Sequence, residues 1–525
     1  MNRPVLGLFV GLSLACASLA QFPGTTQKPA GQSAAAPAPN PDKSFLQGDP
    51  AKDLTPYLEK FLSVFSTVQS ETADPLPVDK AIFEGAIPAM LRQLDPHTQF
   101  FDPGQFEQLR QMEESEQKGF GSIVSVLPGQ VIFLQTLPGT PSNKAGIQAG
   151  DELIAVNNIA IRSLEPEQII GLLTEARQQK INVYVRRQGS AKPLEFSLTP
   201  ELVDAPSVDR AFMLKPSLGY VRISSWDLQT AKQLQDAIKK LGSSQLRGLV
   251  LDLRNNPGGV VKAALDAASL FLSPGQRILT ARGRTTETES ADVPQNASPY
   301  EFKLAVLINA KTASASEILA GALQDHDRAV IVGESSFGKG LVQSVQPLSD
   351  GAGLAITTAF YYTPSGRSIQ RPLRNSALSE RFNNDQQRPT YKTDRGRTVQ
   401  GGGGIEPDIR VSPPALDQLE AVLDGSGAVT SFATKFLSEH SPPPASFAVT
   451  PELLDEFKVF LASRNIQPSI AEWGEERNWI SVRLEEEIVT QARGVDKGDE
   501  IQARHDPQVQ AAIRAIQDGS VLSRR

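Results

Sequence analysis

The sequence predicts a multidomain protein of mixed α+β and α/β class, and three observations support this prediction. The chain has 525 residues, of which 40% are hydrophobic, and this length exceeds what one hydrophobic core organises. Between residues 204 and 412, β-branched apolar runs alternate with amphipathic helical patterns, which is typical of an α/β core. Helical periodicity dominates two further regions, residues 53–117 and 413–525. The net charge of −7 gives no indication of a nucleic-acid partner.

The first 20 residues have the features of a signal peptide: a positive charge at Arg3, an apolar centre, and small residues up to Ala20. We therefore expect an exported protein of the periplasm or cell envelope. The only cysteine of the chain, Cys16, lies in this segment and leaves open a lipoprotein, or a peripheral association with the membrane. Cleavage after Ala20 would leave a chain with neither a disulfide nor a cysteine ligand for a metal.

The regions outside the predicted core differ in character. Residues 21–52 are rich in Pro, Ala, Gln and Gly, a composition that cannot bury a core, and we expect a disordered linker. Residues 53–117 predict an N-terminal helical region with an apolar stripe at Leu54, Tyr57, Leu58, Phe61, Leu62 and Phe65. Residues 413–525 predict a helical C-terminal extension without recognisable chemistry. The sequence leaves open whether that extension forms a homo-oligomer, binds a partner or caps the core.

The most informative segment lies between residues 303 and 343. Buried strands are predicted at residues 304–309 and 328–333, because both runs are short, apolar and β-branched. Between them, small polar residues around Ser314 precede apolar positions at helical spacing, which predicts a helix N-terminus. The resulting βαβ unit has Ser314 at one corner and Lys339 after the second strand.

Ser314 and Ser316 admit two interpretations. A serine here could cap the helix, since serine is favoured at that position. Alternatively, one of them is a nucleophile, because the amides at a helix N-terminus stabilise a developing oxyanion. A serine nucleophile needs a base, yet none of the four histidines stands in a Ser-His-Asp context and no G-x-S-x-G motif occurs. A buried lysine can replace histidine, because desolvation disfavours the ammonium form, and Lys339 is the candidate.

Two further motif matches do not hold. Gly333–Lys339 matches the G-x-x-x-x-G-K pattern of P-loops, but Gly340 stands where that motif needs Ser or Thr. The residues that follow, 341–346, alternate like a strand instead of opening a helix, so no nucleotide partner is expected. Ser115–Lys118 matches the S-x-x-K motif of penicillin-recognising enzymes, but neither S-D-N nor K-T-G accompanies it.

Three segments follow one another along the chain: LDLRNNPGG at 251–259, TASASEILAGAL at 312–323 and FGKGLVQ at 337–343. In this order they resemble the carboxyl-terminal processing peptidases, the tail-specific proteases of family S41. These peptidases are Ser/Lys proteases that carry a PDZ domain. The resemblance covers residues 54–412 well and the C-terminal extension poorly. It implies a crotonase-like α/β serine protease core at residues 204–412.

The resemblance implies a catalytic role for three side chains. Ser314 matches the family's nucleophile, Lys339 its general base, and Gln343 the glutamine that holds the lysine in place. The oxyanion would be bound by two backbone N–H groups, those of Ala315 and Gly259. Gly259 is favoured over Gly258 as the second donor. A plain tight turn at the Asn-Pro-Gly-Gly segment is the alternative. No metal or other cofactor is implied.

Residues 118–203 resemble a PDZ domain. Gly119, Phe120, Gly121 and Ile123 match its carboxylate-binding loop and the strand that follows. Such a domain binds peptides by β-augmentation, in which an extended peptide adds a strand and loop amides bind its terminal carboxylate. The alternative is a small domain packed for stability only.

Together these features predict an exported serine endopeptidase that cleaves protein substrates near their C-termini. Its PDZ domain would capture the free C-terminal tail of the substrate and deliver it to the Ser/Lys dyad. The alternative from another functional class is a catalytically inactive PDZ scaffold that binds peptides.

Overall fold

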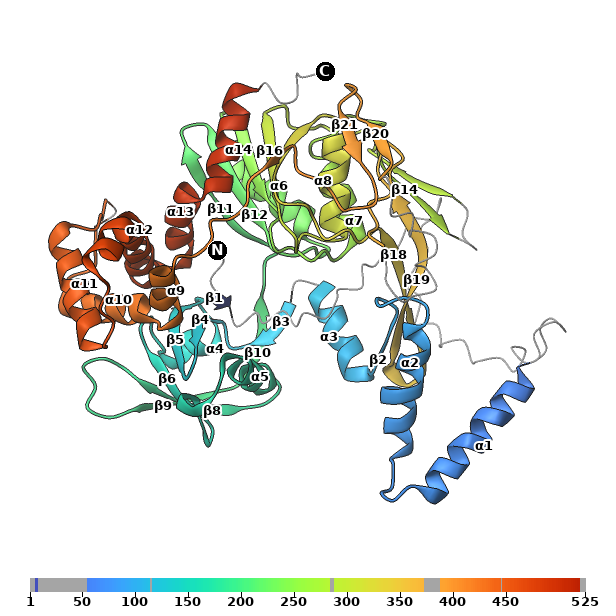
Figure 1. Cartoon of the computed structure of the whole chain (residues 1–525), viewed down its shortest axis with the longest axis horizontal. Helices are drawn as coiled ribbons and strands as arrows, with labels where there is room; N and C mark the ends of the chain where they lie inside the picture. Colours follow the sequence, from blue (N-terminus) through green and yellow to red (C-terminus); the bar gives the residue numbers. More distant parts are fainter. Residues whose placement is uncertain are drawn as a thin grey trace.

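The computed structural model describes residues 5–7, 54–113, 116–283, 288–372, 388–444 and 446–519 (Figure 1). The predicted signal peptide (1–20) and linker (21–52) lie outside these residues, except for Val5–Gly7, which form strand β1. The described part of the chain contains no helix that is long and apolar enough to cross a membrane.

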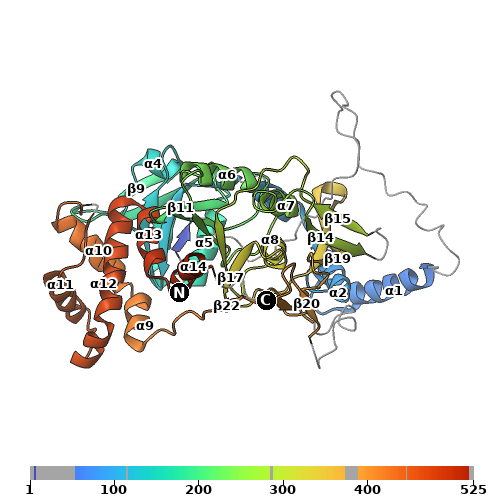
Figure 2. The same ribbon diagram turned by 90° about the horizontal axis from the view of Figure 1, so that it is seen from above.

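Helices dominate the N-terminal region, as the apolar stripe predicts. α1 (Thr55–Glu71) is followed by a π-helical segment η3 (Lys80–Ala86), α2 (Ile87–Arg92) and α3 (Pro103–Glu113). The apolar stripe of α1 is largely exposed, and α1 extends away from the rest of the molecule in both views (Figures 1 and 2). The region is anchored by β2 (Gln99–Phe101), which pairs with β19 (Gly353–Tyr362) of an antiparallel sheet beside the α/β core.

An antiparallel sheet forms the second unit. Its strand order is β1-β4-β5-β6-β8-β9, with β7 beside β6. Helix α5 (Pro166–Ala176) packs on β4 (Ser122–Leu127), and their apolar side chains share one hydrophobic core. β1 pairs antiparallel with β4 and so covers the free edge of that strand. The other elements are β5 (Gln130–Thr136), α4 (Pro141–Ala145), β6 (Glu152–Val156), β7 (Ile159–Ala160), η4 (Ile161–Ser163), β8 (Ile181–Arg186) and β9 (Leu194–Leu198).

A six-stranded sheet forms the α/β core, in the order β11-β12-β13-β16-β17-β22. The strands from β12 to β22 run parallel, as the predicted alternation of strands and helices requires, and β11 is antiparallel. The strands are β11 (Val208–Lys215), β12 (Leu218–Ile223), β13 (Gly248–Asp252), β16 (Lys303–Ile308), β17 (Ala329–Gly333) and β22 (Ile409–Arg410).

Helices cover both faces of this sheet. Side chains alternate along a strand, so Leu249 and Leu251 share one hydrophobic core with α6, α7 and α8. Val250 and Leu307 point to the other face and pack against α14 (Pro507–Asp518). Helix α14, the last in the described part of the chain, is thus a layer that caps the core. The helices of the first face are α6 (Thr230–Lys240), α7 (Val261–Ala268) and α8 (Ala315–Asp325).

A second antiparallel sheet, in the order β15-β14-β19-β18, lies beside α8. β18 (Leu341–Pro347) is the strand that the alternating pattern after Lys339 predicts. β2 from the N-terminal region pairs with β19 (Gly353–Tyr362) and joins this sheet. The remaining elements are β14 (Arg277–Gly283), β15 (Glu289–Asp292) and η5 (Ser349–Gly351).

The C-terminal extension is helical, as predicted. α9 to α12 form a bundle with its own hydrophobic core around Phe432 and Phe457. α13 (Val495–His505) links this bundle to α14, and its first N–H group, that of Val495, donates to the side chain of Gln135 on β5 at 2.9 Å. The bundle helices are α9 (Gln418–Gly425), α10 (Ala428–Glu439), α11 (Pro451–Ser463) and α12 (Ile470–Arg493). Two small antiparallel sheets have two strands each. One consists of β3 (Glu116–Gly119) and β10 (Glu201–Asp204), and the other of β20 (Thr390–Lys392) and β21 (Thr398–Gln400).

Candidate active site

Ser314 occupies a strained turn between β16 and α8. Its φ of 55° and ψ of −116° form a backbone conformation that side-chain-bearing residues rarely adopt and that costs about 1–3 kcal/mol. The residue is 1% exposed, and α8, which begins at the next residue, is buried along its whole length. A serine that only capped the helix would keep extended backbone angles. The strain therefore indicates a functional constraint on this residue.

Lys339 lies in the loop between β17 and β18 and is 4% exposed. Its Nζ donates to Oε1 of Gln343 at 2.8 Å, and Nε2 of Gln343 donates to the backbone carbonyl of His97 at 2.5 Å. The structure thus brings the predicted lysine and glutamine together.

The carboxylate of Glu317 joins the two segments that carry Ser314 and Lys339. Its Oε2 accepts hydrogen bonds from the backbone N–H groups of both residues, at 2.8 and 2.9 Å. Its Oε1 accepts from the N–H of Gly338 at 2.7 Å and from the hydroxyl of Ser336. Burial raises the pKa of the Glu317 carboxyl group, and these hydrogen bonds act in the opposite direction.

Tyr361 on β19 holds the same two residues from the carbonyl side. Its hydroxyl oxygen lies 2.7 Å from the carbonyl oxygen of Lys339 and 3.2 Å from that of Ser314. Burial, followed by the negative charge of Glu317, raises the pKa of the Tyr361 phenol well above its usual value, so the hydroxyl stays a donor. Ser314 and Lys339 are therefore neighbours, each held through both its N–H and its C=O.

The Asn-Pro-Gly-Gly turn lies directly against Ser314. A Cβ atom on Gly258 would come within 2.8 Å of the Cβ of Ser314, so a glycine is needed here. Gly259 forms a parallel bridge with Trp226, which bonds to the backbone groups on either side of this glycine. The N–H of Gly259 therefore points away from Trp226. Within the described part of the chain, neither this N–H nor that of Ala315 has a hydrogen-bond partner.

The predicted peptide-binding residues lie together at the start of β4. Gly119 ends β3, and Phe120 is buried. The carbonyl groups of Phe120 and Gly121 accept hydrogen bonds from backbone N–H groups of the segment after β5, at 2.9 and 2.8 Å. The loop thus turns these carbonyls toward its own domain. Ile123 is half-buried and stands opposite β1 in antiparallel register.

Two other titratable residues, His97 and Asp325, lie on segments that contact the site. The pKa of the His97 ring is lowered to about 4, first by burial and then by the charge of Lys339, against the opposing effect of Asp95.

Asp325 is the last residue of α8 and lies about 16 Å from Ser314 along this helix. Its carboxylate pairs with Arg367 at 2.8 Å. Its place supports the helix and not the chemistry. Among the residues that the structure describes, no three His, Cys, Asp or Glu side chains could hold a metal ion together.

Known protein families match two parts of this chain. Residues 217–373 match peptidase family S41, and residues 133–187 match a PDZ domain. A carboxy-terminal-processing protease of Bartonella bacilliformis is 34% identical over 317 residues, which cover 60% of this chain and 72% of that protein. The chain belongs to the carboxyl-terminal processing proteases of family S41. It is a serine-type peptidase with a PDZ domain, as the sequence predicts.

Two further relatives extend the comparison. A carboxyl-terminal-processing protease of Synechocystis sp. is 36% identical over 292 residues, or 54% of this chain and 68% of the relative. A chloroplastic C-terminal processing peptidase of Tetradesmus obliquus is 34% identical over 296 residues, or 53% of this chain and 63% of the relative. A protease that carries a PDZ domain acts on protein substrates.

Sequence reasoning missed the structural roles of Glu317 and Tyr361. Glu317 stands three residues after Ser314, which is the spacing of a capping box, so its sequence signal is that of a local helix cap. Its bonds to Gly338 and Lys339 come from a loop more than 20 residues away and leave no local pattern. Tyr361 lies among other aromatic residues of β19, and nothing in the sequence distinguishes it from them.

Glu317→Gln should lower the free energy of unfolding by about 3 kcal/mol, because the new NH₂ group would face buried N–H donors and leave them unpaired. Glu472→Gln is a matched control, since Glu472 closes the capping box of α12 at an exposed position. Glutamine serves equally well there, so that change should stay within about 0.5 kcal/mol. Urea unfolding measures both. Equal stability of the two variants would contradict the role of the Glu317 carboxylate.

Proposed function

We propose that the protein is an endopeptidase that cleaves protein substrates near their C-termini with a Ser314–Lys339 dyad. The observation that carries this proposal is the shared anchoring of the two residues, whose N–H groups both bond to Glu317 and whose carbonyls both contact Tyr361. Neither a strained serine nor a buried lysine benefits a scaffold that only binds peptides. The arrangement therefore favours the enzyme over the catalytically inactive PDZ scaffold.

In the proposed reaction, the neutral Nζ of Lys339 accepts the proton of Ser314 Oγ while Oγ attacks the scissile carbonyl carbon. The tetrahedral intermediate collapses when Lys339 gives this proton to the leaving amine. The C-terminal fragment departs, and the rest of the substrate stays on Ser314 as an ester. Lys339 then takes a proton from a water molecule that attacks the ester. When the bond between Oγ and the acyl carbon breaks, Lys339 returns this proton to Oγ, the N-terminal fragment leaves as a carboxylic acid, and Ser314 is restored. Gln343 keeps Nζ oriented throughout.

The N–H groups of Gly259 and Ala315 are the proposed donors to the oxyanion. Gly259 is favoured over Gly258, because the N–H of Gly258 already donates to Oδ1 of Asn256 at 2.9 Å. Ala315 is the first residue of α8, and the positive end of a helix favours negative charge. A preorganised donor of this kind contributes roughly 10²- to 10³-fold to the rate.

The PDZ domain would capture the free C-terminal tail of a substrate by adding it to β4 as a strand. The antiparallel pairing of β1 with β4 supports this proposal, because it places an extended segment on that edge. Arg177, at the end of α5, supports binding of the terminal carboxylate. It is 8% exposed, and two of its guanidinium nitrogens have no hydrogen-bond partner within the described chain. Amides of the loop at 119–121 would complete the carboxylate site.

We also propose that the protein is exported to the periplasm or cell envelope. The features of residues 1–20 support this localisation. The substrates would then be proteins of that compartment with accessible C-terminal tails.

Cleavage of an unfolded protein with an apolar C-terminal tail tests the dyad. Ser314→Ala and Lys339→Ala should each lower the rate at least about 10³-fold, because nucleophile and base act as a unit. Ser316→Ala and Lys311→Ala are the matched controls and should retain cleavage. The hydroxyl of Ser316 already accepts from the indole of Trp226 at 2.8 Å, and Lys311 is exposed. Similar cleavage by all variants would show that the dyad is wrongly assigned.

The pH profile tests the protonation state of the base. Lys339 must be neutral to accept a proton, so kcat/KM should fall about tenfold per pH unit on the acid side of its pKa. His97 cannot produce this decline above pH 5, because its pKa is lowered to about 4 and its ring is already neutral there. Rates should be measured from pH 5 to 10, with circular dichroism to confirm folding. A flat profile over this range would contradict a lysine base.

A further inference from the structure

We infer that the junction between α13 and α14 is a positioning element for the oxyanion turn, which we define as residues Asn255–Gly259. Asp506 and Gln508 at this junction hold Arg254, the residue directly before the turn. The C-terminal extension, which carries no recognisable motif, would thus take part in setting the active-site geometry. This inference rests on the proposed function, because it assumes that the turn supplies an oxyanion donor.

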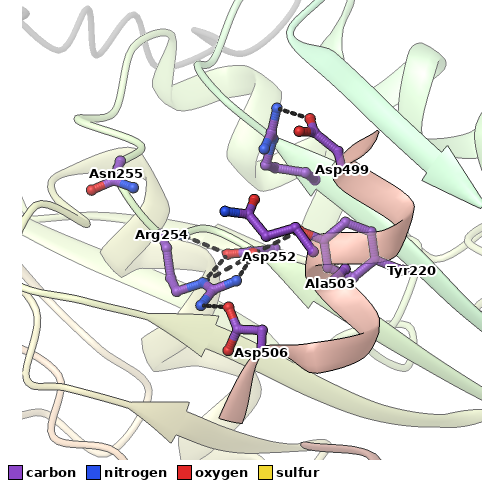
Figure 3. A pocket seen from close by; sticks show the side chains of 9 residues that line it. Tyr220, Asp252, Arg254, Asn255, Asp499, Ala503 and Asp506 are labelled. Carbon is purple, nitrogen blue, oxygen red and sulfur yellow. Dashed lines mark hydrogen bonds and ion pairs between the residues drawn. The ribbon is translucent and has the colours of Figure 1, made fainter. Parts of the chain in front are cut away.

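Arg254 is clamped between the sheet and the C-terminal helices. Its Nε and Nη2 donate to the carboxylate of Asp252 at the end of β13, at 3.0 and 2.6 Å. Its Nη1 donates to Oδ2 of Asp506 at 2.6 Å and to Oε1 of Gln508 at 2.8 Å. Figure 3 shows the guanidinium between the two carboxylates, at the edge of a small pocket under α13 that Tyr220 also lines. Every branch of the guanidinium is therefore engaged.

Asp506 and Gln508, which bind Arg254, are themselves fixed by hydrogen bonds at the start of α14. Oδ1 of Asp506 caps that helix by accepting from the N–H groups of Gln508 and Val509, at 2.7 and 3.2 Å. Nε2 of Gln508 donates to the carbonyl of Val411 at 2.7 Å. The body of α14 is buried against the sheet through Val509 and Ile513. Asp506 and Gln508 therefore stand at the start of a helix that is packed tightly on the core, and they restrict the position of the Arg254 side chain.

Arg254 is joined by its peptide bond to Asn255, the first residue of the turn, and contacts of the turn tie it to the segment that carries Ser314. The N–H of Asn255 donates to Oδ1 of Asn309 at 3.0 Å, and Nδ2 of Asn309 donates back to Oδ1 of Asn255 at 3.0 Å. The carbonyl of Asn256 accepts from the N–H of Ala313, the residue before Ser314, at 3.0 Å. Asn255 has a φ of 60°, so the turn bends sharply just after Arg254. Loosening of Arg254 would therefore shift the turn relative to the nucleophile.

Asp506→Asn tests this inference with little change to the helix, because asparagine caps helices as well as aspartate does. The variant loses the negative charge opposite Arg254. For a cleavable tail peptide we expect kcat to fall about tenfold with KM unchanged, since a misplaced oxyanion donor weakens only the transition state. A peptide aldehyde, which forms a tetrahedral adduct with the nucleophile, should bind about tenfold more weakly. Binding of an uncleavable tail peptide to Ser314→Ala, with and without Asp506→Asn, should be equal.

Asp499→Asn is the matched control. Asp499 also tethers α13 to the core sheet, but it pairs with Arg210 and Arg222 and does not contact Arg254. It should keep kcat and aldehyde affinity within about twofold of the native values, whatever its effect on thermal stability.

The outcomes separate this inference from the function on which it rests. Absence of Ser314-dependent cleavage by the native chain would overturn the proposed function, and the inference with it. Native cleavage that depends on Ser314, together with equal kcat for the Asp506 and Asp499 variants, would overturn the inference alone. Should Asp506→Asn fail to fold, Gln508→Leu removes one acceptor of Arg254 and leaves the cap intact. An unchanged kcat in that variant would also count against the inference.

Discussion

The buried carboxylate of Glu317 is the interaction on which the active site depends. Its two oxygens accept three backbone N–H groups and one hydroxyl, and two of those N–H groups belong to Ser314 and Lys339. A carboxylate without water is stable only when such donors surround it. The loop that carries Lys339 and the turn that carries Ser314 must therefore meet at this point. The hydroxyl of Tyr361 contacts the backbone carbonyl oxygens of the same two residues.

The site is completed by segments from both ends of the described chain. The N-terminal region adds β2 to the second sheet, and the backbone carbonyl of His97 holds the glutamine that orients Lys339. The C-terminal helix α14 covers the outer face of the parallel sheet and contacts Arg254 through its first turn. The central βαβ unit and the loop after it carry the proposed nucleophile and base. Its neighbours fix their positions, so catalytic geometry is a property of the whole core.

The sequence predicts the central part of this fold well, because its signals are local. The strands β16 and β17 are short apolar runs, and the residues around Ser314 open a helix where the small polar cluster predicts one. The pairing of Lys339 with Gln343 follows from the family motif and is present in the structure. The shared role of Glu317 is hidden, because a capping box alone explains its spacing. The role of α14 is hidden as well, since an amphipathic pattern does not say which surface a helix covers.

The identity of the acylated residue tests the assignment of Ser314 as the nucleophile most directly. The native chain is mixed with an excess of a tail peptide, quenched in acid within milliseconds, digested and mapped by mass spectrometry. We expect an ester on Ser314 that adds the mass of the part of the substrate on the N-terminal side of the cleaved bond. This ester should be missing in Lys339→Ala. An acyl group on another residue, such as Ser316, would contradict the assignment of the nucleophile.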